Sequence, residues 1–424
     1  MNELPAEAVY RRRDFYLFIS ARFLSTLAMQ VQSVAIGWQI YGMVHTPLAL
    51  GLVGLCQFAP MFLLTMPAGE IADRFDQRRV FAGALSAQSL ASFMFVGLNA
   101  FGRKEVWLFY LVLVFFGCAR GFSGPSGQSL IAFLVPPDRL PRSIALSSSA
   151  FTTAVIAGPA LGGICFAAVG PISTYVICVA GFAAAAVLIA TLGGRRARPP
   201  VSEASRIARV IEGIRFVRHR PIVLGAISLD LFAVLLGGAT ALLPVFARDI
   251  LHVGSSGLGI LRSAPAAGAA LTSLALARWP IERATGAKMF GAVAVFGVAT
   301  IVFGLSRSFV PSLMALFVIG ASDMISVYIR SSLINLATPD TMRGRVGAVN
   351  MLFVGASNEL GEFESGVTAA WFGTIPAVAL GGAGTLAVVS IWMWLFPPLR
   401  AVDRLTEVTS DSALGIEAEE AAAR

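Results

Sequence analysis

The stretch PISTYVICVAGFAAAAVLIATL, residues 171 to 192, is mainly apolar and carries no charged side chain. A helix needs roughly 20 mainly apolar residues to cross the hydrocarbon core of a bilayer, so this segment alone is long enough to span a membrane. The rest of the chain has the same character, because 56% of its 424 residues are hydrophobic and only 13% are charged. The sequence therefore predicts an all-α membrane protein.

Segments of similar length, bounded by charges, Gly or Pro, recur along the whole chain. We expect twelve spans, at residues 17–41, 48–68, 80–100, 107–134, 144–168, 171–192, 222–246, 256–277, 287–305, 310–336, 345–373 and 377–397. They form two bundles of six helices, one in residues 1–192 and the other in residues 221–400. A linker, 193–220, joins the bundles, and an acidic, alanine-rich tail, 401–424, follows the second.

The basic residues predict the orientation of the chain in the bilayer. Short cytoplasmic loops accumulate Lys and Arg, and placing the N-terminus inside puts most of the 32 basic residues on the cytoplasmic side. An even number of spans then places both termini in the cytoplasm. The formal net charge of +8 is mostly topological on this basis, and we expect no nucleic-acid partner.

The linker contains apolar residues at helical spacing, Ile207, Val210, Ile211 and Ile214, opposite Arg206, Arg209 and Arg215. This pattern is typical of an amphipathic helix that lies along the inner surface of a membrane. A segment that merely joins the two bundles is the alternative interpretation.

The two halves also contain similar segments. SLIAFLVPPDRL, residues 129–140, matches SLINLATPDTM, residues 332–342, in its first three letters and in a Pro-Asp pair. Each segment follows the fourth span of its half. Two related bundles of six helices are typical of a duplicated carrier, whose site is expected near the midplane between the halves.

The loop after the second span reads GEIADRFDQRRV, residues 69–80, and resembles the cytoplasmic signature of the major facilitator superfamily. Asp76 stands where the family pattern has glycine, and five residues fit the pattern: Gly69, Asp73, Arg74, Arg78 and Arg79. AGPALGG, residues 157–163, is similar to the Gly-Pro motif of the superfamily's antiporters, and Arg120 resembles the buried arginine of its third motif. LALGLVGLCQFAP and NELGEFESG most resemble the bacterial efflux branch with the enterobactin exporter and macrolide efflux proteins.

The resemblance implies roles for both motifs. Gly69 and Asp73 share a face near the inner end of the second span, and Asp73 and Arg74 would stabilise one of two access states of a gate. A charged loop required only for topology remains the alternative. In the other motif, Gly158, Pro159, Gly162 and Gly163 would let the fifth span bend, either to pack closely or to block leak.

Carboxylates are the least expected residues of the apolar spans. FVGASNELGEFESGV, residues 353–367, contains Glu359, Glu362 and Glu364, and the second half also places Asp230 and Asp323 at similar depth. An ionised group at a helix centre costs about 2.5 to 3.5 kcal/mol on insertion scales, so these acids should face a cavity, pair with arginine or carry protons. Proton coupling is expected at Asp230, Asp323, Glu359 and Glu362. Structural pairs with Arg262 and Arg330 are the alternative.

The first half carries mostly neutral polar residues at this depth, among aromatic side chains. We expect an amphipathic substrate to contact Gln30, Ser33, Trp38, Phe116, Arg120 and Ser123, with Arg262 added from the second half. For any single Phe, a place in the packed core or against lipid is the alternative.

The sequence gives little support for an enzymatic function. All three histidines fall in loops, and neither a G-x-S-x-G motif nor a phosphate-binding loop occurs. We therefore expect no enzyme, no cofactor and no bound metal. The sequence favours a monomeric secondary transporter of the bacterial inner membrane that exports an amphipathic small molecule by proton antiport and alternating access. A siderophore exporter is the alternative, followed by a metal-cation exporter or a sensor with a transporter fold.

Overall fold

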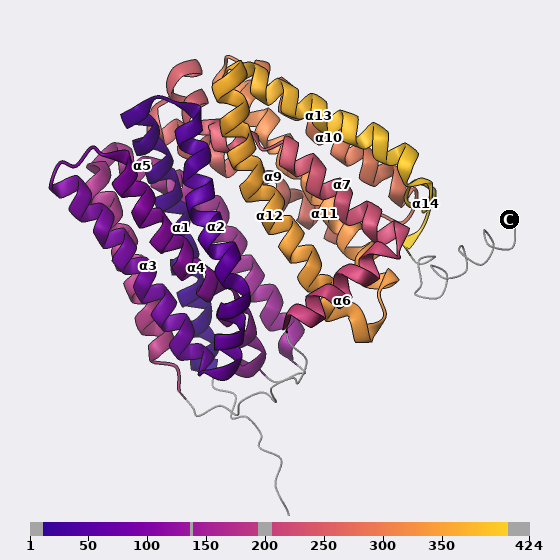
Figure 1. The fold of residues 1–424 in the computed structure, drawn as a ribbon, viewed down its shortest axis with the longest axis horizontal. Coiled ribbons are helices and arrows are strands. Elements are labelled where there is room, and N and C mark those ends of the chain that lie inside the picture. The colour runs from indigo at the N-terminus through magenta and orange to yellow at the C-terminus, as the bar shows by residue number, and fades with distance from the viewer. Residues whose placement is uncertain (1–11, 136–138, 194–205, 406–424) are drawn as a thin grey trace, which may run out of the picture. The chain divides into compact units, whose positions relative to one another are not determined.

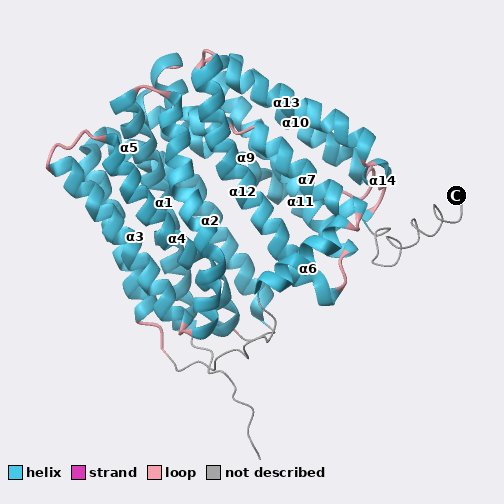
Figure 2. Cartoon of the chain, viewed as in Figure 1, coloured by secondary structure: helices cyan, strands magenta, loops and turns pink. Residues whose placement is uncertain are grey.

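The computed structural model describes residues 12–135, 139–193 and 206–405. Within these residues, helices and the loops between them make up the chain, with no strand (Figures 1 and 2). Hydrocarbon offers no hydrogen-bond partners, and a helix satisfies its peptide groups internally, so this architecture suits a chain that is apolar over most of its length. Nine of the described helical segments are long and apolar enough to cross a membrane.

The spans expected from the sequence lie in the described helices with four differences, one of which is the end of α7 (Pro221–Leu236) within the span expected at 222–246. The spans expected at 17–41 and 345–373 lie in α1 (Arg12–Val44) and α12 (Asp340–Phe372), which are not among the nine apolar segments. Both helices carry polar and charged side chains inside their apolar stretches, which lowers their mean hydropathy. The spans expected at 144–168 and 171–192 both lie in α5 (Leu140–Ala190).

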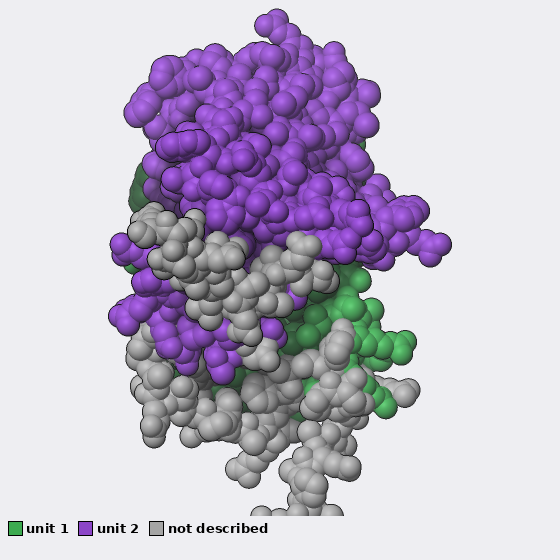
Figure 3. Space-filling model, turned by 90° about the vertical axis from the view of Figure 1, so that its right-hand side faces the viewer, with its two compact units in different colours: residues 1–45, 56–203, 253–263 green, residues 46–55, 204–252, 264–424 purple. Residues whose placement is uncertain are grey.

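The chain divides into two compact units (Figure 3). Unit 1 comprises Met1–His45, Cys56–Glu203 and Val253–Ser263, and unit 2 comprises Thr46–Leu55, Ala204–His252 and Ala264–Arg424. The units differ from the two expected halves in two short segments. The start of α2 (Pro47–Arg74) belongs to unit 2, and the start of α9 (Gly254–Arg278) belongs to unit 1.

Unit 1 is built from α1, most of α2, α3 (Gln77–Ala100), α4 (Val106–Leu134) and α5. Its longest element, α5, has 51 residues, and its one non-helical residue is Gly170, with φ 75° and ψ −179°. Only glycine adopts that conformation readily, and Pro171 follows it. The helix is therefore interrupted at this point.

Contacts with α1 show that α5 reverses direction at Gly170. In order along α5, Gly162 lies against Val31, Tyr175 donates a 2.7 Å hydrogen bond to Gln39, and Gly181 lies against Ala28. The contact point thus moves along α1 and then returns. α5 consists of two antiparallel helices joined at Gly170.

Unit 2 contains α6 (Arg206–Arg218), α7 (Pro221–Leu236), a 3-10 turn η2 (Ala239–Leu242), α8 (Leu243–Val245), a π-helical turn η3 (Phe246–Ile250), most of α9, α10 (Thr285–Leu305), α11 (Phe309–Ala337), α12, α13 (Thr374–Leu395) and α14 (Pro397–Ala401). The expected span at 222–246 is thus a regular α-helix only as far as Leu236. The pair Gly237–Gly238 ends α7, and a Cβ at Gly238 would lie 2.7 Å from the carbonyl oxygen of Gly361 in α12. The break in the helix allows this close approach of two backbones.

In the linker, α6 packs against the start of α12. Gly213 faces the carbonyl oxygen of Arg345, and Glu212 forms an ion pair with the Arg345 side chain. Ile211 and Ile214 are exposed. Of the other expected members of the amphipathic pattern, Val210 is partly buried against the core of unit 2 and Arg215 is exposed. The side chains of Arg206, Ile207 and Arg209 lie outside the described part of the chain.

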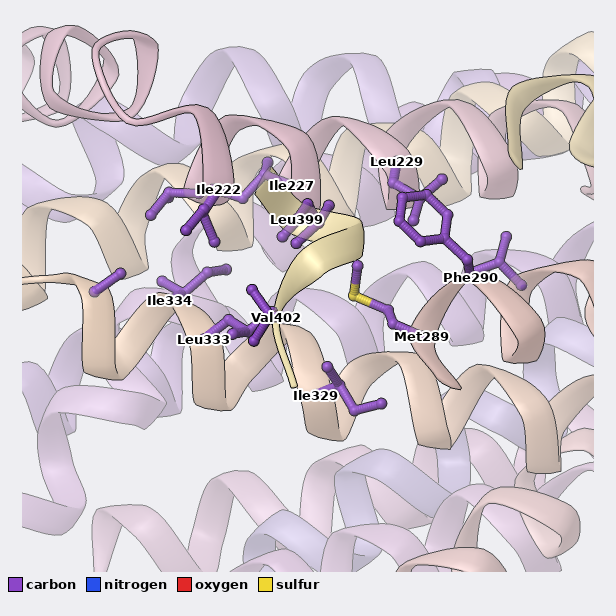
Figure 4. Close-up of a cluster of buried hydrophobic side chains, with 14 of the residues drawn as sticks. Ile222, Ile227, Leu229, Met289, Phe290, Ile329, Leu333, Ile334, Leu399 and Val402 are labelled. Atoms are coloured by element: carbon purple, nitrogen blue, oxygen red, sulfur yellow. The ribbon is translucent and has the colours of Figure 1, made fainter. Parts of the chain in front are cut away.

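The core of unit 2 is an apolar cluster with side chains from α6, α7, α10, α11, α12, α13 and α14, part of which Figure 4 shows. The labelled side chains are Ile222, Ile227 and Leu229 from α7, Met289 and Phe290 from α10, Ile329, Leu333 and Ile334 from α11, and Leu399 and Val402 at the C-terminal end. Leu399 and Leu333 are fully buried. The segment after α13 is therefore part of the core, although the sequence predicts a tail from residue 401. Residues 406–424 of that expected tail lie outside the described residues.

This C-terminal segment also completes the start of α10. Asp403 Oδ1 accepts a hydrogen bond from the Ala284 amide at 2.8 Å, and the carbonyl oxygen of Val402 accepts one from the Gly286 amide at 2.9 Å. The first amide groups of a helix have no partner within the helix. Here, a distant part of the chain provides that partner.

Helices in unit 2 approach closely where glycine faces a backbone. A Cβ at Gly320 in α11 would coincide with the carbonyl group of Pro265 in α9, and a Cβ at Gly268 would meet the carbonyl oxygen of Phe317. Lipid tails are as apolar as leucine side chains, so membrane helices associate through such close packing rather than through a hydrophobic driving force.

We predict that Gly320→Ala destabilises the protein by about 1 to 3 kcal/mol, because the added methyl group forces α9 and α11 apart. The control is Gly291→Ala in α10, where no atom lies within 4 Å of the added Cβ. Unfolding of the purified protein in detergent measures both variants. Equal stability of the two would contradict close packing at this crossing.

Candidate functional site

A buried ion pair joins two helices of unit 2. Asp230 in α7 and Arg330 in α11 are in contact, with 6% and 3% of their surfaces exposed. In so apolar a setting, either charge alone costs several kcal/mol, and each is stabilised by the other. Asp230 is therefore paired with Arg330 in this structure, as the alternative to a coupling role expected.

A second carboxylate faces the same place. Asp323 and Asp230 line a cavity of about 10 Å³, together with Ala233, Val234, Val293, Phe296 and Ser326. Such a volume is just enough for one water molecule. Asp323 thus shares a confined space with a carboxylate that already has the Arg330 guanidinium as its partner, so one negative charge is in excess when all three groups are ionised.

The glutamates of α12 form a separate group, outside the lining of this cavity. Glu364 accepts a 2.6 Å hydrogen bond from Thr368 one turn further along the helix. Glu362 lies over the start of α2, where its Oε2 is 3.1 Å from the position that a Cβ of Gly54 would take. Glu359 is half-buried and interacts with other groups of the chain. The four expected coupling residues are thus divided between two places in unit 2.

The loop motif links α3 to the end of α5 in unit 1. Asp76 is the N-cap of α3, with φ −62°, and its side chain accepts a 3.0 Å hydrogen bond from the Arg78 amide. The Arg78 guanidinium contacts Asp76 at 3.6 Å and donates a hydrogen bond to the carbonyl oxygen of Leu192. Aspartate in place of the family's glycine is explained by this cap, since the conformation needs no glycine.

The remaining motif residues are placed as follows. Gly69 is buried in α2 and Arg79 is exposed in α3. Asp73 and Arg74 lie at the end of α2, but their side chains lie outside the described part of the structure.

The Gly-Pro motif of α5 is a packing surface with two sides. A Cβ at Gly158 would lie 2.5 Å from Gln30 Cβ, and one at Gly162 would lie 2.9 Å from Val31 Cα, so this side contacts α1. Gly163 faces the start of α9, where Ser255 donates a 3.2 Å hydrogen bond to its carbonyl oxygen.

A second hydrogen bond strengthens this contact, from the Ala160 amide to Ser263 Oγ at 3.1 Å. Pro159 lies inside the helical part of α5. The interruption of α5 is at Gly170, outside the motif.

Two of the expected substrate contacts are engaged inside unit 1. Phe116 is 1% exposed and packs edge-on against Phe182, with ring centroids 5.9 Å apart. Ser123 accepts a 3.0 Å hydrogen bond from Gln88. Phe116 is thus part of the packed core, which was the alternative for any single Phe.

The other expected contacts are half-buried: Gln30, Ser33, Trp38, Arg120 and Arg262. Arg120 donates to Gln57 Oε1 at 3.5 Å, whereas Arg262 has no polar partner among the residues that the structure describes. A half-buried guanidinium without a partner is suited to binding an anionic group.

Sequence reasoning missed Asn99, Tyr175 and Ser326, three polar residues that the structure brings together with others. Gln39 donates to Asn99 at 2.5 Å and accepts from Tyr175, which links α1, α3 and α5. Ser326 lines the cavity of Asp323 and follows it by three residues, so helical spacing from Asp323 was a usable signal. Asn99 and Tyr175 gave no such signal, because their contact depends on tertiary packing.

Charged side chains buried within helical units, a signature loop between α2 and α3 and glycine-rich packing surfaces define a transporter of the major facilitator superfamily. Within that class, the chain belongs to the transmembrane secretion effector family, whose pattern matches residues 6–421. It is a multi-pass protein of the bacterial inner membrane.

Relatives are similar over nearly their full length. The sequence is 24% identical to the enterobactin exporter EntS of Citrobacter koseri over 386 residues, which cover 90% of this chain and 91% of EntS. It is 28% identical to the multidrug efflux pump Tap of Mycobacterium tuberculosis over 426 residues, which cover 95% of this chain and 98% of Tap. These relatives are transporters and not enzymes.

Solved structures show the same fold. The nucleoside transporter NupG superimposes with a TM-score of 0.75 at 12% identity, covering 90% of this chain and 100% of that one. A bacterial homologue of the human lysosomal transporter Spinster gives 0.69 at 15% identity, covering 92% and 96%. At such low identities, the similarity concerns the fold alone.

We predict that Arg330→Met destabilises the protein by about 3 to 5 kcal/mol, because Asp230 then remains buried without a cation. The double variant Asp230→Leu/Arg330→Met removes both charges and recovers most of this loss. Unfolding in detergent measures each variant. Arg345→Met is the control: it breaks the more exposed pair with Glu212 and costs less than about 1 kcal/mol. Similar stability of Arg330→Met and Arg345→Met would rule out a buried pair.

Proposed function

We propose that the protein is a secondary transporter that exports an amphipathic small molecule from the cytoplasm in exchange for protons, by alternating access. The family and the export functions of EntS and Tap support export. Proton coupling is supported by one observation in particular, the cavity that Asp323 shares with Asp230, the ion-pair partner of Arg330.

The proposed topology has twelve crossings with both termini in the cytoplasm. It adds α1 and α12 to the nine apolar segments and counts α5 twice, with its turn at Gly170. At 1.5 Å per residue, the 51 residues of α5 would extend about 75 Å as one rod, more than twice the thickness of the hydrocarbon core. The proposal also places α6 on the inner surface, with exposed Ile211 and Ile214 beside Arg215. One chain is the proposed working unit, because the coupling candidates all belong to unit 2.

Alternating access requires contacts that form in one state and separate in the other. Two sets of backbone contacts are the proposed candidates. In unit 2, the start of α2 meets α12, where a Cβ at Gly366 would lie 2.7 Å from Gly51 Cα. In unit 1, the start of α9 meets α5, where Gly259 and Gly163 approach each other. Both contacts bring glycine backbones together, the second with hydrogen bonds from Ser255 and to Ser263, and the proposed topology assigns both to the outer side of the membrane.

Proton coupling follows from the charges at the cavity. Arg330 compensates one carboxylate, and the space is too small for the hydration that a second ionised carboxylate requires. Binding of a proton at Asp323 removes the excess charge. A motion that admits water to the cavity favours release of that proton. Asp323 is therefore the proposed carrier, and Asp230 remains the ion-pair partner of Arg330.

We predict that Asp323→Asn abolishes dye efflux driven by an imposed pH gradient in reconstituted vesicles, while exchange of dye down its own gradient persists. Glu364→Gln is the matched control, since this acid belongs to the same unit and already holds a hydrogen bond to Thr368. It should transport as the native chain does. If Asp323→Asn still accumulates dye against its gradient, the proton is carried elsewhere, and Glu359 and Glu362 become the candidates.

Siderophore export is a second candidate, supported by Arg262. Catecholate and carboxylate groups are anionic, and this guanidinium has no polar partner among the described residues. Arg22 and Arg120 are the other cations that the sequence places in spans of unit 1, but they contact Ser147 and Gln57.

We predict that Arg262→Gln weakens binding of an anionic catecholate about tenfold or more, because a charge-assisted hydrogen bond contributes roughly 1.5 to 3 kcal/mol. Binding of a cationic dye should not weaken. Arg307→Gln, in the loop before α11, is the control and should leave both ligands unaffected. Competition between catecholate and dye in detergent measures the affinities. Unchanged catecholate binding by Arg262→Gln would argue against this candidate.

A further inference from the structure

A groove of about 330 Å³ runs between α10 and α11 in unit 2. Its lining consists of Ile281, Lys288, Ala292, Val295, Val318, Ala321, Ser322 and Ile325. It shares no residue with the cavity at Asp323. The groove is thus separate from the proposed coupling site.

Small side chains create the groove. Ala292 of α10 and Ala321 and Ser322 of α11 leave the space that larger residues would fill. Ser322 is the one hydroxyl of the lining, and it donates a 2.8 Å hydrogen bond to the carbonyl oxygen of Val318 in its own helix. It therefore offers no free donor, and the walls are apolar.

Lys288 is the single charged residue of the lining. It lies in the first turn of α10, and Ala292 and Val295 follow at helical spacing, one and two turns further along the groove. Its side chain is exposed and forms no ion pair with any residue that the structure describes. A lysine in this position extends its ammonium group toward the interface while its methylene stem covers apolar surface.

An apolar groove with a cation at one end has the chemistry of a phospholipid site. We propose that one acyl chain of an anionic phospholipid occupies the groove, with its phosphate at Lys288. A basic residue near an anionic membrane surface attracts the acidic headgroups. A free phosphate ion would contact only Lys288. A phospholipid would contact Lys288 with its phosphate and the apolar walls with its acyl chain. The proposal requires only that the chain lies in a membrane, so it is independent of the transported substrate and of proton coupling.

The test is lipid binding by the full chain in detergent, followed by native mass spectrometry. Phosphatidylglycerol and phosphatidylcholine with identical acyl chains are the probes. We expect one tightly bound phosphatidylglycerol per chain and weaker binding of phosphatidylcholine. Equal binding of the two lipids would overturn the assignment to an anionic headgroup.

Two variants separate the parts of the site. Lys288→Gln should reduce the preference for phosphatidylglycerol about fivefold, the equivalent of roughly 1 kcal/mol at room temperature. Ala321→Leu fills the groove and should abolish tight binding of both lipids. Retention of the tight site in Ala321→Leu, or an unchanged preference in Lys288→Gln, would overturn the proposal.

Matched controls are Arg278→Gln at the end of α9 and Ala387→Leu in α13, which are exposed and lie outside the groove lining. Both should bind lipid as the native chain does. A transported dye is added as a competitor. If rising dye concentration displaces the bound phosphatidylglycerol, the groove is a substrate site and the proposal fails. If lipid stays bound, the lipid assignment stands.

Discussion

Hydrocarbon cannot form hydrogen bonds, and this property of the membrane interior governs both the backbone and the charged side chains of the protein. Peptide groups are satisfied within helices, so the described residues form no strand. Helices pack where glycine exposes the backbone, as at Gly320 and Gly163. Buried charges are costly without a partner, and the pair of Asp230 with Arg330 is the most buried ion pair among the described residues.

Much of the fold was predictable because the bilayer fixes the length of each apolar segment. The sequence indicated the helices and also the two segments that make up α5. It did not indicate that α7 ends at Leu236, because apolar residues continue beyond Gly237–Gly238 and hide the break. Nor did it indicate that α2 and α9 each contribute to both compact units. Such divisions depend on contacts between distant residues, which periodicity does not encode.

The sequence predicted which acidic residues are candidates for the site, but not which of them lie together. Acids inside apolar spans are costly, so Asp230, Asp323 and the glutamates of α12 stood out from composition alone. Which of them meet depends on how far each helix is rotated about its axis. The structure places Asp323 beside Asp230 and leaves Glu359 and Glu362 elsewhere. Phe116 illustrates the opposite case, since an aromatic residue near polar neighbours can equally belong to the packed interior.

The hydrogen bonds at the start of α10 bear on how the protein is made. The Ala284 amide is satisfied by Asp403, which lies 119 residues further along the chain, and the Gly286 amide by Val402. Leu399, in the same C-terminal segment, belongs to the apolar cluster of unit 2 (Figure 4). During synthesis these partners leave the ribosome near the end of translation, long after α10 itself. Unit 2 therefore reaches its final packing only when the chain is almost complete, whereas α1 to α5 of unit 1 have all their sequence available much earlier.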